Sequence, residues 1–441
     1  MVSLALYNII DTFWVARLGH KAIAALTTVL PYHVLLIAIA VGTGIGISAL
    51  TSRRFGEKNT EAINHIAGQI FPISGVFGSI FLTVAVFFPH TILNILGATP
   101  DIMDYATQYL VIISFGSPIL VFSIAANSLL RGSGDALRPM IFMITATVTN
   151  MILDPFMIFG IGPFPAMGVR GAALATVISY LLGAGLSSYY IIIARKSAYR
   201  IKLRHLKPSL PMLYDIYRVG LPSMTIQIME SVIYALFNNA LSTFGSLAIA
   251  AAGIGIRVID LAFMPVLGVS GGLLPIVGFN FGARLRNRLW RAVKLASGGL
   301  ALFMVIVLVP LEIFTPNLIR IFSNDPEMLA IAVPGMHIML STLFITGPSI
   351  LFITTFQGLS KGREALVLSL IRQLVFFVPL LLLLPRILGI YGIWLSWAIS
   401  EVLAFFVSGS WLFREYKLQQ RTNVWSDIPA PEANSKAKHP S

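Results

Sequence analysis

Long apolar segments, separated by short polar stretches, constrain this chain more than any other feature of its sequence. They span residues 1–17, 26–52, 62–88, 105–130, 138–160, 168–194, 215–243, 248–278, 288–314, 330–357, 364–385 and 389–413. A helix needs roughly 20 apolar residues to cross a bilayer. Each segment is too uniformly apolar for a barrel strand, in which apolar and polar residues alternate. The twelve segments predict an all-α membrane protein with twelve transmembrane helices.

Composition agrees with this class and excludes several kinds of chemistry. Charged residues make up 11% of the 441 residues, whereas a soluble domain has about 25%. Cysteine is absent, which excludes disulfides, thiol catalysis and cysteine-bound metals. The first segment carries neither a basic start nor a small-residue cleavage site, so we expect no cleaved signal peptide. The glycine-rich stretch GTGIGIS (42–48) is followed by no lysine, so an ATP-driven pump is not predicted. We also expect that the protein is not an enzyme.

Basic residues alternate between the loops. One set of loops holds Arg53, Arg54, Lys58, Arg131, Arg138, Arg195, Lys196, Arg200, Lys202, Arg204, Lys207, Arg284, Arg286, Arg288, Arg291, Lys361, Arg363, Arg414, Lys417 and Arg421. The other set holds only Arg17, Lys21, Arg170, Arg320 and Arg386. The positive-inside rule places the first set, and both termini, in the cytoplasm. Topology therefore accounts for the net charge of +13, and no nucleic-acid partner is expected.

The second half of the chain repeats the first. RLGHKAIAAL at 17–26 resembles TFGSLAIAAA at 243–252, an offset of 226 that also pairs Gly42 with Gly268 and Gly46 with Gly272. GVRGAALATVIS, from residue 168, likewise resembles GIYGIWLSWAIS, from residue 389. Each repeat holds six helices, an even number, so the two halves enter the membrane in the same orientation. Parallel repeats of this kind are a transporter design.

The repeat sets the expected domains. They are an N-terminal lobe (1–200, helices 1–6), a basic cytoplasmic linker (201–214), a C-terminal lobe (215–414, helices 7–12) and a polar, disordered cytoplasmic tail (415–441). The seventh helix opens with YRVGLP, which has no counterpart before the first helix. We therefore expect helix 1 to be truncated at its start.

Carboxylates interrupt two of the most apolar segments, in YNIIDTFWV (Asp11) and TNMILDPF (Asp154). A charge at the centre of a spanning helix costs about 2.5–3.5 kcal/mol on insertion scales, so such residues usually serve function. Asn150 and Asp154 share a helix face because they are four residues apart. Pro155 has no N–H, so the Met151 carbonyl lacks its helical donor. Carboxylates, an amide oxygen and a free carbonyl suit a hard cation such as Na⁺.

Five motifs together resemble the multidrug and toxic compound extrusion (MATE) family, nearest its DinF-like branch: YNIIDTFWVARLG, ALTSRRFGEKN, LLRGSGDALRP, TNMILDPF and GVRGAALAT. The resemblance implies two six-helix lobes and export of amphiphilic or cationic compounds in exchange for H⁺ or Na⁺, with no other cofactor. It implies a coupling-ion site of Asp11, Asn150, Asp154 and Thr176, which would be metal ligands under Na⁺ coupling.

The resemblance also marks residues of the substrate or proton path. Tyr109 and Asn127 match the family's helix-4 tyrosine and asparagine. Glu230 matches a helix-7 glutamate of the family's NorM branch, but that branch's helix-10 aspartate has no counterpart in 330–357. We therefore expect the N-terminal lobe alone to carry the coupling ion. Arg257 and Asp260 are expected to pair, whereas Arg372 and Glu401 receive no role.

Plainer interpretations stay open. Asp11 could pair with Arg17, Asp154 could merely bond Asn150, Tyr109 could belong to the interfacial aromatic belt, and Asn127 could join helices. A lipid-linked oligosaccharide flippase of the same wider superfamily is one alternative function, and a channel or membrane scaffold is another. We expect a monomer in the plasma (inner) membrane whose partners are small-molecule substrates and lipids.

The loop charges generate a topological prediction. Because the chain has no cysteine, single thiols can be introduced for labelling. Thiols at Ser197 and Ser435 should react only from the cytoplasmic side, and a thiol at Ser323 only from outside. Same-side labelling of Ser197 and Ser323 would overturn the twelve-helix topology.

Overall fold

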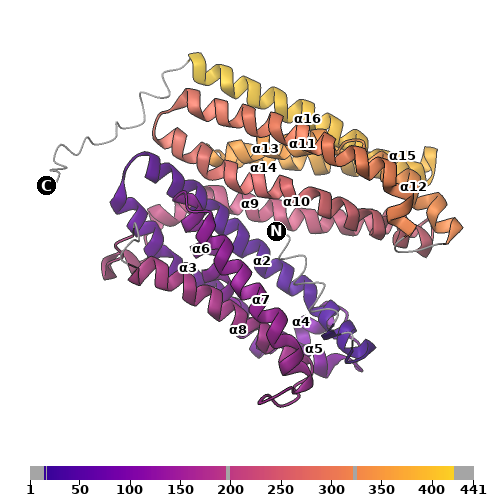
Figure 1. The fold of residues 1–441 in the computed structure, drawn as a ribbon, viewed down its shortest axis with the longest axis horizontal. Helices are drawn as coiled ribbons and strands as arrows, with labels where there is room; N and C mark the ends of the chain where they lie inside the picture. The colour runs from indigo at the N-terminus through magenta and orange to yellow at the C-terminus, as the bar shows by residue number, and fades with distance from the viewer. Residues whose placement is uncertain (1–13, 16, 195–198, 321–324, 422–441) are drawn as a thin grey trace. The chain divides into compact units, whose positions relative to one another are not determined.

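The described part of the chain consists almost entirely of helices joined by short loops. The computed structural model describes residues 14, 15, 17–194, 199–320 and 325–421, and no β-strand occurs among them. Within these ranges nine helices are long and apolar enough to cross a membrane, or up to eleven spans if each of two bent pairs counts as one. Figure 1 shows the helices along the chain. The prediction of an all-α membrane protein is confirmed.

The first half contains α2 (His20–Gly56), α3 (Thr60–Phe87), α4 (Pro89–Ile95), α5 (Met103–Phe115), α6 (Ser117–Gly132), α7 (Leu137–Phe159), α8 (Val169–Ser188) and the short helices η1 (Tyr189–Ile193) and η2 (Leu203–Leu206). The second half contains α9 (Leu210–Ser242), α10 (Ser246–Gly282), α11 (Arg286–Arg320), α12 (Pro326–Leu340), α13 (Leu343–Gly358), α14 (Gly362–Leu370), η3 (Ile371–Phe377), α15 (Val378–Leu388) and α16 (Ile390–Arg421).

Eleven of the twelve predicted spans have a helical counterpart. The predicted span 105–130 is a pair, α5 and α6, bent by 47°, and 330–357 is a second pair, α12 and α13, bent by 48°. Pro118 lies in the first turn after the first bend, and it lacks the N–H that would bond the Ser114 carbonyl. The predicted span 1–17 lies outside the described residues except for Trp14, Val15 and Arg17, so the truncated first helix stays a prediction.

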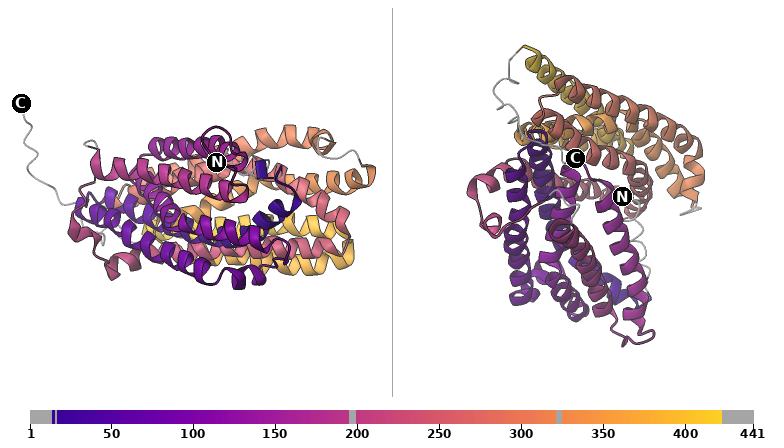
Figure 2. Two further views of the ribbon diagram at one scale, coloured as in Figure 1. Left: turned by 90° about the horizontal axis from the view of Figure 1, so that it is seen from below. Right: turned by 60° about the vertical axis from the view of Figure 1, so that its left-hand side comes forward.

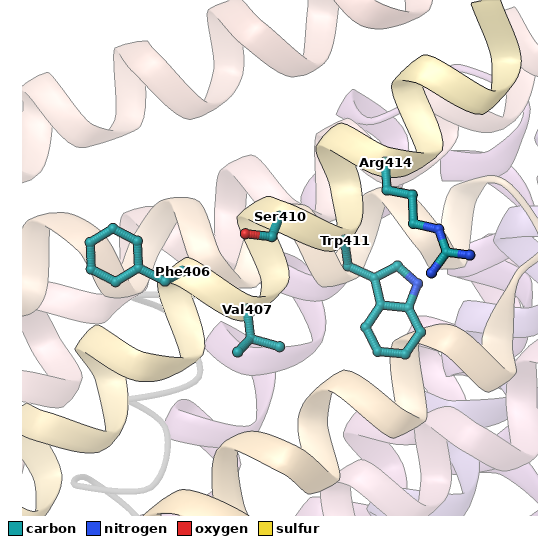
Figure 3. A pocket seen from close by; sticks show the side chains of 5 residues that line it. All are labelled: Phe406, Val407, Ser410, Trp411 and Arg414. Carbon is teal, nitrogen blue, oxygen red and sulfur yellow. The ribbon is translucent and has the colours of Figure 1, made fainter. Parts of the chain in front are cut away.

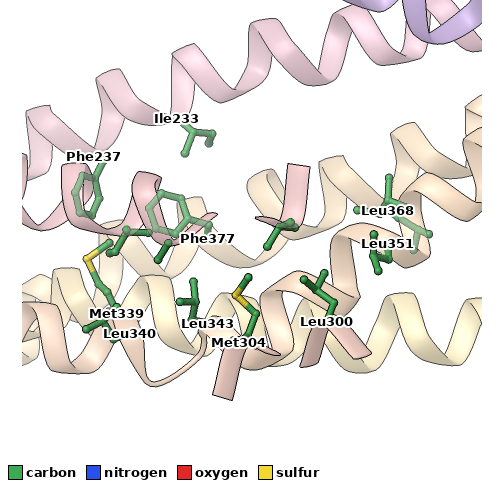
Figure 4. Close-up of a cluster of buried hydrophobic side chains, with 14 of the residues drawn as sticks. Ile233, Phe237, Leu300, Met304, Met339, Leu340, Leu343, Leu351, Leu368 and Phe377 are labelled. Atoms are coloured by element: carbon green, nitrogen blue, oxygen red, sulfur yellow. The ribbon is translucent and has the colours of Figure 1, made fainter. Parts of the chain in front are cut away.

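The chain divides into two compact units. One, here the N-lobe, contains the chain up to Thr51 and Thr60–Met224; the other, the C-lobe, contains Ser52–Asn59 and the chain from Thr225. Figures 1 and 2 show the helices of each unit lying side by side. Each has its own apolar core. The C-lobe core gathers Phe237, Met304, Leu351 and Phe377 from different helices (Figure 4).

Two predicted boundaries need correction. α9 begins at Leu210, inside the predicted linker, because its early residues pack on the N-lobe: the Tyr217 ring lies 6.0 Å from that of Phe77. α16 continues to Arg421, inside the predicted tail. Glu415 is buried there and accepts hydrogen bonds from Lys361 (2.6 Å) and Gln419 (2.8 Å). Polar side chains that satisfy one another thus extend the helix beyond its apolar part.

The rest of the linker is bound to α3 through backbone groups. The Gln69 amide nitrogen donates to the carbonyls of His205 (2.9 Å) and Lys207 (2.8 Å), and its oxygen accepts from the Ser209 N–H (3.0 Å). Asn64 accepts from the Arg200 N–H at 2.7 Å. Buried amides of α3 therefore hold the linker, and the linker's Arg204 also pairs with Glu61 of α3 at 2.7 Å.

Glycines let α2 and α9 approach closely. A Cβ on Gly46 would overlap the carbonyl oxygen of Ile216 and lie 3.1 Å from the backbone nitrogen of Gly220. The repeat-related Gly272 differs, since nothing lies within 4 Å of a Cβ placed there. Small residues that allow close backbone contact are a common means of packing helices in membranes.

This contrast predicts opposite results for one substitution at two repeat-related sites. Gly46→Ala should destabilise the protein by about 1–3 kcal/mol, because a backbone carbonyl cannot move aside as a flexible side chain can. Gly272→Ala should be neutral or stabilising by up to about 1 kcal/mol, since alanine favours the helix. Thermal unfolding in detergent measures both. Equal melting temperatures for the two variants would contradict the close α2–α9 contact.

Candidate functional site

The predicted polar cluster begins on α7. Asn150 and Asp154 lie one turn apart on the same face, and both are 0% exposed. Pro155 follows directly, and the helix continues for one more turn, to Phe159. It ends at Gly160, whose φ of 73° is left-handed and suits glycine. The helix thus buries a carboxylate and an amide. Next to them in the helix is the Met151 carbonyl, which accepts no helical hydrogen bond because Pro155 has no N–H.

Thr176 on α8 completes the described part of the cluster and is also 0% exposed. The Asn150 amide nitrogen donates to Asp154 Oδ1 (3.2 Å) and to Thr176 Oγ1 (3.4 Å). The two helices approach closely at Gly171, where a Cβ would overlap the Met157 carbonyl. Asn150 Oδ1 accepts no hydrogen bond from any described residue. Three of the four predicted site residues therefore meet, and they present oxygen atoms to one another.

Asp11, the fourth predicted residue, lies outside the described residues, as does Asn8. Among the residues that the structure covers, no group of three or more histidine, aspartate or glutamate side chains could hold a metal ion. The described oxygen donors are one carboxylate, one amide and one hydroxyl. Oxygen donors of this kind are the ligands that hard cations prefer.

The predicted path residues lie elsewhere in the N-lobe. Tyr109 on α5 is buried in the apolar core. Asn127 on α6 accepts a hydrogen bond of 3.2 Å from Ser187 on α8. This bond joins α6 to α8 and does not involve α7. This bond fits the plainer interpretation of Asn127 as an interhelical contact.

Sequence reasoning missed a polar pair one turn from Thr176. Tyr180, on the same face of α8, lies 3.2 Å from His33 Nε2 on α2. Nearby, the Tyr32 hydroxyl donates to the Phe81 carbonyl (2.8 Å) and accepts from Ser114 (3.0 Å). The spacing of Thr176 and Tyr180 signals their shared face, but nothing in the sequence shows that α2 brings an imidazole to it.

The C-lobe holds a second set of charged residues. Glu230 on α9 and Asp260 on α10 are exposed. Arg372 lies in the π-helical turn η3, with Nη1 3.7 Å from Oε1 of the buried Glu401 on α16. The side chain of Arg257 lies outside the described set, so its pairing with Asp260 stays a prediction. Arg372 and Glu401, to which the sequence assigned no role, are therefore partners of each other in the structure.

One surface hollow, on α16, includes no predicted site residue. It has a volume of about 410 Å³ and is lined by Phe406, Val407, Ser410, Trp411 and Arg414 on one stripe of α16. Figure 3 shows the Trp411 ring beside the Arg414 guanidinium, with Phe406 farther along the helix. The hollow is a surface feature of a single helix, so the buried α7–α8 cluster remains the candidate site.

Known proteins resemble this chain over most of its length. The MatE family model matches residues 1–156 and 222–383. A FAD transporter of Shewanella oneidensis is 27% identical over 399 residues, which cover 90% of this chain and 88% of that protein. The multidrug export protein MepA of Staphylococcus haemolyticus is 26% identical over 420 residues, covering 95% and 91%.

Solved structures share the fold over nearly the whole chain. An outward-facing multidrug resistance MATE family transporter of the MOP superfamily superposes with a TM-score of 0.90 at 27% identity, covering 96% of this chain and 94% of that one. A MOP superfamily transporter from Pyrococcus furiosus gives 0.88 at 27% identity, with the same coverage. Since the family model matches most of the chain, in both halves, this chain belongs to the MatE family and is a multi-pass membrane transporter, not an enzyme.

Proposed function

We propose that this transporter is a secondary antiporter that exports amphiphilic, often cationic, compounds in exchange for H⁺ or Na⁺. The observation that carries the proposal is the fully buried cluster of Asn150, Asp154 and Thr176. Two of the similar proteins support the substrate class, since they are named a multidrug export protein and a multidrug resistance transporter. The proposed setting is the plasma membrane, with a monomer whose termini are both cytoplasmic.

The buried Asp154 carboxylate gives the cluster its affinity for a cation. Asp154 lies five residues before the end of α7 and is fully buried; an uncompensated charge is costly there, and a bound Na⁺ or H⁺ offsets that cost. Asn150 and Thr176 supply neutral oxygens beside the carboxylate. In the proposal Asp11 adds the second carboxylate. The cluster is therefore most stable with its cation bound, which makes its occupancy sensitive to an ion gradient.

Coupling follows from reciprocity between two sites. If the ion lowers the affinity for substrate, the substrate must lower the affinity for the ion by the same factor. We propose that the ion enters from outside, weakens substrate binding and so releases the substrate there. Tyr109, Asn127 and Glu230 would line the substrate or proton path. Titrating substrate affinity against pH and against Na⁺ distinguishes the two ions, because only the true coupling ion changes that affinity.

A second candidate substrate class is an organic anion such as a flavin dinucleotide. The Shewanella oneidensis relative, 27% identical over 399 residues, is named a FAD transporter. Proteoliposomes loaded with FAD or with a lipophilic cation, under an imposed Na⁺ or pH gradient, decide between the two. Gradient-driven efflux of FAD without efflux of cations would replace the cationic substrate class with the anionic one.

Asp154→Asn should reduce gradient-driven efflux to the level of empty liposomes. The change keeps the size of the side chain but removes the charge that binds the coupling ion. Asp104→Asn, which alters an exposed aspartate of the same lobe, is the matched control and should leave efflux unchanged. Melting temperatures verify that both variants fold. Efflux at the wild-type rate in Asp154→Asn would refute this site.

Glu230→Gln should act on the substrate and not on the ion. We expect the affinity for a lipophilic cation to fall roughly tenfold, because an exposed carboxylate facing the ligand is lost. The dependence of binding on Na⁺ or pH should persist, since the α7–α8 cluster is intact. Loss of ion dependence in Glu230→Gln, together with its retention in Asp154→Asn, would place the coupling ion in the C-lobe instead.

A further inference from the structure

Three helices of the C-lobe each carry a charged residue far from the end of the helix. Glu230, Arg372 and Glu401 lie on α9, η3 and α16. At 1.5 Å per residue, each is roughly 16–24 Å along its helix from the ends where α9 meets α10 and α15 meets α16. A residue that far from the end of a spanning helix is expected inside the hydrocarbon layer of the membrane, which is about 30 Å thick. Charged residues there pair with one another or serve a pathway.

An aromatic cluster fixes how these helices meet. The Phe237 ring on α9 lies 6.1 Å from that of Phe377 at the end of η3, and 6.0 and 6.5 Å from those of Trp394 and Trp397 on α16. Figure 4 shows Phe237 and Phe377 on facing helices. Phe237 is two turns beyond Glu230, and Trp397 is one turn before Glu401. The charges therefore lie beside a packed junction of the three helices.

The contact between Arg372 and Glu401 is loose. Its 3.7 Å separation exceeds a hydrogen bond, and Arg372 Nε and Glu401 Oε2 have no hydrogen-bond partner among the described residues. Elsewhere in the same lobe, Lys361 and Glu415 are 2.6 Å apart, and Gln419 binds the other carboxylate oxygen. An ion pair that only stabilises the fold is expected to be closely hydrogen-bonded, as Lys361 and Glu415 are, since incomplete bonding in the interior is costly.

Arg372 also acts on a carboxylate of another helix. Its guanidinium lies close enough to the Glu230 carboxylate on α9 for their opposite charges to interact, and Tyr234, one turn along α9, is within range of both charges. Glu230 and Tyr234 are exposed, whereas the Arg372 and Glu401 side chains are 14% and 6% exposed. One buried cation thus interacts with carboxylates of two other helices, the buried Glu401 and the exposed Glu230. The π-helical turn that carries it is a distortion often found at functional sites.

We infer that Arg372 is a tethered cation that competes with cationic substrates for Glu230, and that Glu401 receives the guanidinium when a substrate takes its place. Arg372 is therefore a specificity-determining residue: it weakens the binding of cations and favours ligands that are neutral or anionic. A lipophilic cation would contact the Glu230 carboxylate and the Tyr234 ring, whose face attracts positive charge. The inference rests on the proposed export of charged amphiphiles.

Two probes of the same shape and opposite charge test it: tetraphenylphosphonium and tetraphenylborate, titrated into purified protein. Glu401→Gln removes the buried carboxylate, so Arg372 should turn to Glu230 and weaken phosphonium binding roughly tenfold. Arg372→Gln with Glu401→Gln removes the competitor as well, and should strengthen phosphonium binding above wild type while weakening borate binding. Arg386→Gln, an exposed arginine on the same spanning helix, is the control and should change neither.

A purely structural pair predicts a different result. Its loss would lower the affinity for both probes together, so an unchanged ratio of phosphonium to borate affinity in the double variant would overturn the inference.

A second measurement needs no ligand. If Arg372 is shared, Glu230→Gln and Glu401→Gln should each be tolerated, because the other carboxylate still neutralises the guanidinium. Together they should lower the melting temperature by more than the sum of the single effects. Asp260→Asn combined with Glu401→Gln should be additive. Additive behaviour of Glu230 and Glu401 would refute the sharing of Arg372. Strong coupling without binding of either probe would instead refute the proposed substrate class.

Discussion

The hydrocarbon core offers no hydrogen bonds to the backbone, and the rest of this structure depends on that constraint. Each spanning segment must satisfy its own N–H and C=O groups, so the described spanning segments are helices. Hydroxyls follow the same rule: Thr315, Thr355 and Ser396 donate to the carbonyl four residues earlier in their own helices. Polar side chains that bond between helices, such as Asn150 with Thr176, depart from this pattern.

The internal repeat duplicates the framework but not the chemistry. At the offset of 226, Asp11 corresponds to Phe237. Asn150 and Asp154 fall at Phe376 and Leu380 by that offset, and at Ile371 and Val375 by the offset of 221 that holds from residue 168, so the polar cluster of the N-lobe has an apolar counterpart in either register. The C-lobe has its own charged set instead, in which a cation, Arg372, faces Glu401 at 3.7 Å. One lobe thus gathers neutral oxygens around a carboxylate, and the other places a guanidinium beside one. In the proposed function, the first lobe would bind the coupling ion and the second would discriminate among substrates.

Glycines show the same divergence at the level of packing. Gly42 and Gly46 allow α9 to lie against α2, whereas a Cβ placed on the repeat-related Gly268 or Gly272 would have nothing within 4 Å. The repeat therefore preserves residue types whose present roles differ. Contacts made by the neighbouring helix, and not the residue itself, decide whether a glycine is required.

The sequence by itself determined the helices, the family resemblance and the shared face of Asn150 and Asp154, because hydropathy and the helical period act along one segment. It placed boundaries less well at α9 and α16, where polar residues continue a helix through contacts with other helices. Only the tertiary structure decided that Thr176 joins α7, that His33 meets Tyr180, and that Arg372 faces Glu401. Those pairs depend on how separate helices are rotated and shifted relative to one another. The packing of whole helix surfaces sets that arrangement, and no local pattern in the chain encodes it.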